Sequence, residues 1–266
     1  MNLENMIRVI PHRIDNAAMS LSIDRALFDS MNESLNNNDK VSPILRTYQF
    51  SKPVVIFGNY QSLEKRYDGS IMNVDLVKRD TGGGHMYFGN KDIHFSFIAP
   101  FEFYKTNDLI LQYHKVNGYI VEALKKCGYD ASLGRTSIRV NGKILVGTAR
   151  KHEKLSALHQ GAILHTKYDD PIFKLLMARD DEIKRWKELV TSLQEYNHND
   201  FRKIPKEIIS SIGDYYEEYL TADEISKAKG FYEKKYTNMN FIKEGTKNED
   251  ICLIALEWTK DDDKKN

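Results

Sequence analysis

An arginine followed closely by three consecutive glycines forms the first motif that could do chemistry. Arg79 stands three residues ahead of Gly82, and Gly83 and Gly84 complete the run. Adjacent glycines allow backbone conformations that are closed to other residues, and they let a ligand come close to main-chain amides. The guanidinium of Arg79 offers a forked cation for a phosphate oxygen. A glycine run is also typical of a bend in a sheet, so this motif alone leaves both interpretations open.

A lysine between small residues forms the second motif. Lys143 directly follows Gly142, and Gly147, Thr148 and Ala149 come shortly after it. A lysine held beside a tight turn could neutralise a carboxylate and then the phosphate of a mixed anhydride. Because lysine is rarely buried, the residue by itself would more often be a solvent-facing strand lysine. The presence of both motifs in one chain favours a functional role for Lys143.

The elements that must position these motifs follow from the hydrophobic pattern. Asn16 is a suitable N-cap, and apolar residues recur at helical spacing after it, which predicts a helix over 17–33. Strands are predicted at 44–45 and in the run PVVIFGNYQ, which begins at Pro53. In DIHFSF, residues 92–97, apolar and polar side chains alternate, which predicts a half-buried strand beyond the glycines.

A long helix and a hairpin are predicted in the middle of the chain. The apolar stripe over 109–124 lies behind the polar residues 106–107, and Gly128 stands where a left-handed C-cap is expected. The pair at 141–142, Asn-Gly, tolerates positive φ angles and so predicts a two-residue turn with Lys143 opening the returning strand. Further helices are predicted at 171–178, 181–195 and 205–219, another at 222–235 behind a capping box of Thr221 and Glu224, and a last strand at 251–258.

Composition limits the classes of function. The chain has 266 residues, enough for one substantial core, and 39 basic against 38 acidic residues give a net charge of +1. This balance provides no bulk attraction to nucleic acid or an anionic membrane. The N-terminus has no targeting pattern and no stretch approaches the roughly 20 apolar residues of a membrane span, so we expect a cytoplasmic protein. Cys127 and Cys252 lie far apart without histidine spacing, which predicts neither a disulfide nor a zinc site.

Taken in order, the motifs resemble the lipoate-protein ligase branch of the biotin and lipoate ligase superfamily. NAAMSLSIDRALF resembles the family's early helix, and PVVIFGNYQ resembles the strand after it. Two basic residues, a spacer, a serine or threonine and three glycines follow in the family, here 78–84. The hairpin with a glycine-lysine pair and a Gly-Ser/Thr-Ala tripeptide comes next, here 142–149. HQGAILH and ELVTSL resemble later segments, and LTADEISKAKGFYEKKYTNMN resembles the helix that ends the domain.

The interleaving of strands, hairpins and helices already favours an α+β arrangement over a doubly wound parallel sheet. The resemblance makes this a class II synthetase or biotin/lipoate ligase-like fold, with a mixed or antiparallel sheet and packed helices. It implies a catalytic domain over 1–240 and a short C-terminal extension, 241–266, with one strand and a charged tail.

The resemblance also implies a two-step reaction. Lipoate and ATP give lipoyl-AMP, an acyl-adenylate, and pyrophosphate; a lysine of a lipoyl domain of 2-oxoacid dehydrogenases, or of glycine-cleavage H protein, then attacks the acyl carbon. Lys143 would be catalytic, stabilising charge on the carboxylate and phosphate, and Arg79 would hold phosphate. ATP and Mg²⁺ are the implied cofactors, and a separate accessory C-terminal subunit is an implied partner. The residues implied to bind the substrate or adenylate are Arg79, Gly82, Gly83, Gly84, His85, Met86, Tyr87, Lys143, Gly147, Thr148 and Ala149.

Two stretches on the nucleotide side depart from the family's pattern. After the glycines the family usually continues with a small residue, an aromatic, His-Asp and Gly-Asn, whereas this chain has Phe88 and Gly89 within that stretch. Where the family has Asn-Asp before the hairpin, this chain has Thr136 and Ser137, so an expected magnesium carboxylate is missing. Asp92 is the candidate replacement as a metal ligand. These departures bear on adenylation more than on the binding of an acyl group.

Two alternative functions remain open. An octanoyl or lipoyl transferase of the same superfamily would need a nucleophilic thiol, because the transferred acyl group must rest on a thioester. Cys127 and Cys252 both lie away from the glycine-lysine hairpin in the sequence, which disfavours this alternative. A noncatalytic paralogue that holds a lipoyl group or adenylate is favoured by the altered nucleotide residues and opposed by the retained Lys143 and glycines. A biotin ligase is disfavoured, because its glycine-rich signature differs from the triplet found here.

Overall fold

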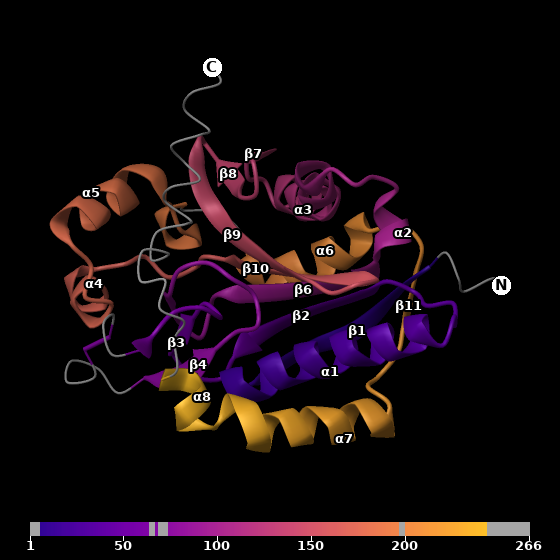
Figure 1. The fold of residues 1–266 in the computed structure, drawn as a ribbon. Helices are drawn as coiled ribbons and strands as arrows, with labels where there is room; N and C mark the ends of the chain where they lie inside the picture. Colours follow the sequence, from indigo (N-terminus) through magenta and orange to yellow (C-terminus); the bar gives the residue numbers. More distant parts are fainter. Residues whose placement is uncertain (1–5, 64–66, 69–73, 197–199, 244–266) are drawn as a thin grey trace.

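The computed structural model describes residues 6–63, 67–68, 74–196 and 200–243. A mixed eight-stranded sheet forms the centre of the molecule, and a three-stranded sheet lies beside one end of it (Figure 1). The large sheet has the order β11-β1-β2-β6-β10-β9-β8-β7, and the small one has the order β4-β3-β5. The large sheet contains β1 (Ile7–Asp15), β2 (Ile44–Phe50), β6 (Ile93–Pro100), β7 (Ala131–Leu133), β8 (Ile138–Val140), β9 (Lys143–His152), β10 (Ser156–Ile163) and β11 (Tyr215–Glu217). The small sheet contains β3 (Val54–Phe57), β4 (Asp75–Lys78) and β5 (Met86–Phe88).

Helices cover both faces of the large sheet. One face carries a packed pair, α1 and α7, and the other carries α3 and α6, while α4 and α5 lie beside the small sheet (Figure 1). The helices are α1 (Ala17–Asn36), α2 (Phe101–Tyr104), α3 (Leu109–Lys126), α4 (Asp170–Leu175), α5 (Asp180–Leu189), α6 (Ile204–Ser211), α7 (Ala222–Phe231) and α8 (Met239–Lys243). Short 3₁₀ turns occur at Leu193–Glu195 and Phe201–Lys203, and a π-helical turn, η5 (Tyr232–Tyr236), continues α7. The mixed sheet with packed helices confirms the predicted fold class.

Local sequence signals define several of these elements. The side chain of Asn16 accepts a hydrogen bond from the main-chain N–H of Met19 at 2.8 Å, so α1 begins where its cap predicted. Thr221 and Glu224 form the predicted capping box at the start of α7. At the hairpin between β8 and β9, the turn residues at 141–142 have φ angles of 50° and 79°, which confirms the predicted Asn-Gly turn.

Some predictions about elements differ from the structure, and one cannot be compared with it. The strand β6 is buried on both faces rather than half-buried, because its polar side chains His94 and Ser96 also face the interior. The helix predicted over 205–219 ends at Ser211, and Gly213 with φ +84° begins a turn that leads into β11. The predicted strand at 251–258 lies outside the described residues.

The described residues reach past the predicted domain boundary at residue 240. Helix α8 crosses this position and packs against β4 of the small sheet, so the boundary stays a prediction. Within the described residues, no helix is both long enough and apolar enough to span a membrane.

Candidate functional site

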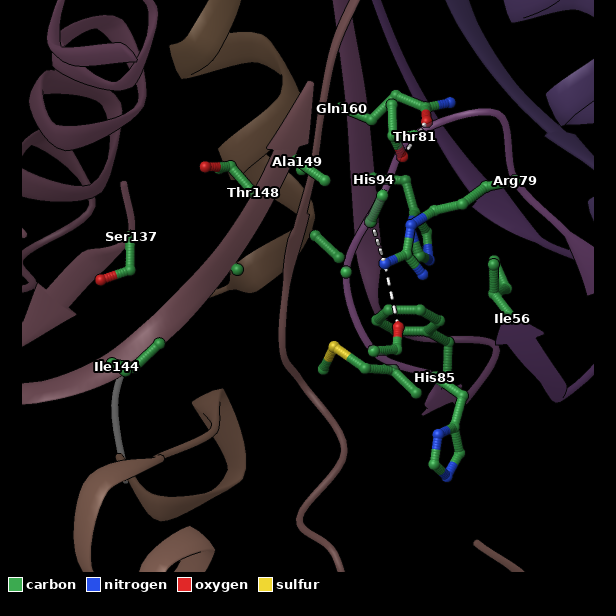
Figure 2. A pocket seen from close by; sticks show the side chains of 18 of the residues that line it. Ile56, Arg79, Thr81, His85, His94, Ser137, Ile144, Thr148, Ala149 and Gln160 are labelled. Carbon is green, nitrogen blue, oxygen red and sulfur yellow. Dashed lines mark hydrogen bonds between the residues drawn. The ribbon is translucent and has the colours of Figure 1, made fainter. Parts of the chain in front are cut away.

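A cavity of about 400 Å³ lies between the two sheets, beside the glycine run. The small sheet contributes Ile56 and Met86 to its walls, and β9 and β10 contribute Ala149 and Gln160. Figure 2 shows Arg79, Thr81 and Gln160 together on one side of it. Its walls are mainly apolar, which suits a ligand with a hydrocarbon portion.

The glycine loop is defined here as residues 79–84, and it packs unusually close to its neighbours. Gly83 has φ +95°, a conformation that residues with a side chain rarely adopt. A Cβ atom on Gly83 would lie 2.8 Å from a guanidinium nitrogen of Arg79. A Cβ on Gly58, just after β3, would lie 1.9 Å from the carbonyl oxygen of Gly83. Glycine is therefore required at both positions for the loop to lie against the end of β3.

Arg79 is the cation of this loop and lines the cavity. Its Nη2 donates to the carbonyl oxygens of Gly82 and Gly84, at 2.7 and 2.9 Å. Burial lowers the pKa of Arg79 to about 10, so the guanidinium still carries its charge at neutral pH. Among the described residues no acidic side chain forms an ion pair with Arg79, which leaves its charge available for an anionic ligand.

The three residues after the glycines lie in different places. Met86 lines the cavity, and Tyr87 does not, because consecutive side chains of β5 point to opposite faces. Tyr87 instead packs edge-on against the ring of Tyr168. The chain around His85 lines the cavity, but its imidazole stacks on Phe57 and points away from the centre of the cavity (Figure 2).

The small residues of the second motif lie on the opposite wall. Gly147, Thr148 and Ala149 all line the cavity from β9. The hydroxyl of Thr148 donates to the main-chain oxygen of Thr136, so the loop between β7 and β8 is held against β9. Thr136 and its neighbour Ser137 also line the cavity.

The catalytic role of Lys143 stays a prediction, because the structure places this residue outside the described lining of the cavity. The structure does not place its side chain among the groups that line the cavity; the neighbouring Ile144 lines it instead. The ammonium of Lys143 lies in an exposed position and donates to the main-chain oxygen of Lys187, at the end of α5, at 3.4 Å. Adjacent residues of a strand point to opposite sides, which is why one enters the cavity and the other leaves it.

Asp92 is not placed to bind a metal. Its side chain is fully buried, and its oxygens accept from the main-chain N–H groups of Gly89, His165 and Thr166, at 2.6, 2.6 and 2.8 Å. Burial raises the pKa of Asp92 to about 6, although the three N–H donors oppose this effect. The carboxylate therefore joins the loop before β6 to the end of β10.

The donor groups at the cavity do not fit a magnesium ion. Mg²⁺ prefers carboxylate oxygens in octahedral geometry, and Glu182 is the one acidic residue among the described residues that line the cavity. Its carboxylate accepts from the main-chain N–H of Arg179 in the cap of α5, at 3.0 Å, and pairs with the same residue's guanidinium. Among the described residues, no three His, Cys, Asp or Glu side chains come together as a possible metal site.

Sequence reasoning missed two buried polar residues at the cavity. His94 is surrounded by the rings of Tyr48, Phe50 and Phe88, and burial lowers its pKa to about 3, so the imidazole is neutral. Gln160 lies on β10 and is 8% exposed. The alternation within β6 suggested that His94 would face solvent, so only the pairing of β6 between two other strands could have shown its burial.

The fold and the cavity define a class of protein: an α+β domain with a largely apolar cavity between a large and a small sheet, lined on one side by Arg79 and the glycine loop. Residues 16–212 match the family model for the lipoyl protein ligase A/B catalytic domain, and the chain belongs to this family.

Relatives in the family carry both ligase and transferase names. The chain is 27% identical over 246 residues to lipoate-protein ligase A subunit 1 of Thermoplasma acidophilum, covering 84% of this chain and 90% of that one. It is 25% identical over 198 residues to the octanoyltransferase LipM of Carboxydothermus hydrogenoformans, covering 66% and 71%.

Solved structures share the fold. One is the bipartite lipoate protein ligase of Thermoplasma acidophilum, studied with its E2 lipoyl domain; it has a TM-score of 0.76 at 24% identity and covers 90% of this chain and 96% of that one. Another is a lipoate-protein ligase A bound with ATP, with a TM-score of 0.74 at 24% identity, covering 88% and 96%.

Proposed function

We propose that this chain is the catalytic subunit of an ATP-dependent lipoate-protein ligase. Arg79 is the observation that carries the proposal: its guanidinium, which has no acidic partner among the described residues, lines a largely apolar cavity beside bare glycine main chain. Such a site suits a carboxylic acid with a hydrocarbon tail, first as the free acid and then as its phosphate anhydride. The ligase names of several relatives support the same proposal.

The chemistry takes place in two steps. An oxygen of the acid attacks the α-phosphorus of ATP, and pyrophosphate leaves. The amine of an acceptor lysine then attacks the acyl carbon, the bond from that carbon to the phosphate oxygen breaks, and AMP leaves with the electron pair. Arg79 and the main-chain N–H groups of Gly82 to Gly84 bind the phosphate oxygens in both steps, and the charge that develops there is stabilised by donors already in position. No step is assigned to Mg²⁺, because the described donors do not fit it.

Lys143 enters this proposal as a second cation. Its hydrogen bond to the oxygen of Lys187 is long and exposed, so its release costs at most about 1 kcal/mol. We propose that the ammonium leaves this position when the acyl phosphate is bound. The acceptor is proposed to be a lipoyl domain or glycine-cleavage H protein, and the partner in adenylation a separate accessory subunit.

Product formation tests the proposal directly. The protein is mixed with lipoate or octanoate, ATP and Mg²⁺, with and without a candidate accessory subunit, and pyrophosphate release and acceptor acylation are followed. Acylation that requires ATP and falls in Arg79→Met supports the ligase. Supplying synthetic lipoyl-AMP isolates the second step: Lys143→Ala should slow acyl transfer, and Lys187→Ala, which keeps the main-chain oxygen, serves as the matched control. An equal rate in wild type and Lys143→Ala would remove the lysine from the mechanism.

A noncatalytic acyl-binding subunit is the second candidate. The outward position of Lys143 and the misfit of Mg²⁺ favour it, and tight binding of lipoyl-AMP without pyrophosphate release or acylation under any condition would support it. A transferase that uses Cys127 is disfavoured, because Cys127 lies at the end of α3, outside the cavity lining, and burial raises the pKa of its thiol.

A further inference from the structure

A buried carboxylate forms the centre of a polar network beneath the glycine loop. Asp24 lies on α1 and is 1% exposed. Its oxygens accept from the hydroxyls of Tyr48 at 3.0 Å and Ser96 at 2.6 Å, and from the guanidinium of Arg46. The Nε2 of Gln160 donates to the same carboxylate at 2.6 Å. Every donor group is buried, so the network is shielded from competing water.

The carboxylate of Asp24 sets the orientation of the Gln160 side chain. An ionised carboxylate only accepts hydrogen bonds, so the amide nitrogen of Gln160 must face it. The amide oxygen then faces the glycine loop, where the hydroxyl of Thr81 donates to it at 3.0 Å (Figure 2). The proton of the Thr81 hydroxyl is committed to this bond, and Thr81 is fully buried. One buried charge on α1 thus fixes the side chain of a residue inside the loop.

We propose that Gln160 is a positioning residue that holds the glycine loop, through Thr81, in the geometry that binds the acyl carboxylate or phosphate. This inference rests on the proposed function for the identity of the ligand. The contacts with the anion come from Arg79 and the main-chain N–H groups of Gly82 to Gly84. Gln160 acts on these groups indirectly, through Thr81. Without its bond to Gln160, Thr81 is free to rotate and the loop samples positions in which these donors no longer converge.

Binding of lipoic acid, measured by calorimetry, is the first readout. Gln160→Met keeps the length of the side chain and removes both hydrogen bonds, and we expect binding about tenfold weaker, as for one lost hydrogen bond. Thr81→Val should weaken binding to a similar degree. Because both variants remove the same link, the double variant should be no weaker than either single one. Ser96→Ala is the matched control: it removes another donor to Asp24 but leaves the loop tethered, so binding should stay unchanged.

A charge variant separates positioning from a general effect on folding. When protonated, the side chain of Gln160→Glu donates to Asp24 and accepts from Thr81, as the amide does; when ionised, it is repelled by Asp24. The other charged or titratable groups of this network and of the cavity beside it include, among the described residues, Arg46 and Tyr48 on β2, Arg79 of the glycine loop, His94 on β6, Tyr113 on α3 and Arg150 on β9. We expect this variant to bind lipoic acid like wild type at pH 5.5 and at least tenfold more weakly at pH 8, while Gln160→Met is weak at both. A purely structural role would change stability without this pH dependence of binding.

Amide hydrogen exchange of the loop tests the inference without any ligand. We expect exchange at Gly82 to Gly84 to be at least fivefold faster in Gln160→Met than in wild type, with no change in Ser96→Ala. If wild type binds no lipoic acid but the loop still loosens, the proposed ligand fails and the positioning role stands. If Gln160→Met matches wild type in both binding and exchange, the positioning role is overturned while the ligase proposal is unaffected.

Discussion

At position 83 the backbone and a neighbouring side chain together leave no room for a methyl group. The positive φ angle disfavours any residue with a Cβ, and that atom would also collide with the guanidinium of Arg79. Gly82 differs, since a Cβ there would meet nothing closer than 3.8 Å, a ring carbon of Tyr60. The two glycines therefore differ within one motif: a side chain fits at Gly82, whereas at Gly83 it would be strained and would displace the Arg79 guanidinium.

Alanine substitution should separate these roles. We expect Gly83→Ala to lower the free energy of unfolding by about 1–3 kcal/mol, because a non-glycine residue would occupy a strained conformation. Its Cβ would also displace the Arg79 guanidinium, so lipoic acid binding should fall. Gly82→Ala is the matched control and should change both quantities little. Denaturant titration and calorimetry measure the two effects, and similar behaviour of both variants would contradict the assignment.

Asp92 should make stability depend on pH. Its pKa in the folded protein is about 6, against an unfolded value of 3.8, so the folded state holds its proton more tightly. The stabilisation is complete below the unfolded pKa and is lost as pH rises through 6, and the loss between pH 4 and 7 amounts to about 2.4 kcal/mol. Asp92→Asn should lack this slope, and Asp39→Asn, at an exposed position, should keep it. Unfolding free energies at several pH values would decide the matter.

At the scale of single residues, the sequence predicted which residues form the two motifs better than it predicted which way their side chains point. Arg79 and the glycines were singled out from their chemistry, and they do line the cavity, although the glycine run alone was equally typical of a bend in a sheet. The direction of Lys143 depends on the phase of β9 relative to the sheet, and a single strand pattern does not reveal it. Asp92 was misassigned because its partners are main-chain groups at Gly89 and at 165–166, distant in sequence from each other.

At the scale of elements, the C-terminal end of α7 holds the base of the glycine loop. The π-helical turn η5 presents two successive side chains to Asp80: the ammonium of Lys235 and the hydroxyl of Tyr236, the latter at 2.5 Å. Arg25 of α1 lies 3.8 Å away on the other side. Burial opposes ionisation of Asp80, but Lys235, Tyr236 and Arg25 hold its pKa below the usual range. The π-helical turn is thus a local feature that serves a distant loop.

Removing one hydroxyl from this contact should affect the cavity. We expect Tyr236→Phe to lower the free energy of unfolding by about 1.5–3 kcal/mol, the usual contribution of a buried hydrogen bond to a charged group. Lipoic acid binding should weaken as well, because Asp80 immediately precedes Thr81. Tyr219→Phe, at a side chain that is 79% exposed, is the control and should leave both unchanged. Normal binding in Tyr236→Phe would show that η5 supports the fold alone.

Elements that begin or end at a capping or turn residue could be predicted from the sequence, and elements defined by long-range pairing could not. The caps at Asn16 and Thr221 and the turn at 141–142 are local, so they appear in the sequence as they appear in the structure. The helix expected over 205–219 failed because its last residues form β11, which is defined by pairing with β1 at the far end of the chain. Long-range pairing overrides local propensity there.

At the scale of the whole molecule, the cavity exists because two sheets meet without closing on each other. The small sheet contributes one wall and the β9–β10 pair the other, and the glycine loop spans the gap between them. Neither sheet contains the site alone. A ligand that contacts both walls should therefore raise the free energy of unfolding of the whole described domain.

Thermal unfolding with and without lipoic acid tests this view. At a free concentration one hundred times the dissociation constant, the ligand should raise the free energy of unfolding by about 2.7 kcal/mol. Arg79→Met should lose most of this gain at the same concentration. Arg13→Met, which alters an exposed arginine paired with Asp15, should retain it. An unchanged melting temperature at saturating lipoic acid in wild type would argue against the acid as ligand.

The contact between Asp80 and η5 also has a consequence for biosynthesis. Asp80 and Lys235 are separated by 155 residues. The glycine loop therefore lacks this anchor until a length of chain well beyond residue 236 has been synthesised. Strands β9 and β10, which form one wall of the cavity, emerge before η5, so this wall can form while the glycine loop still lacks its anchor. We therefore expect a ligand to bind in the cavity only after nearly the whole described part of the chain has left the exit tunnel.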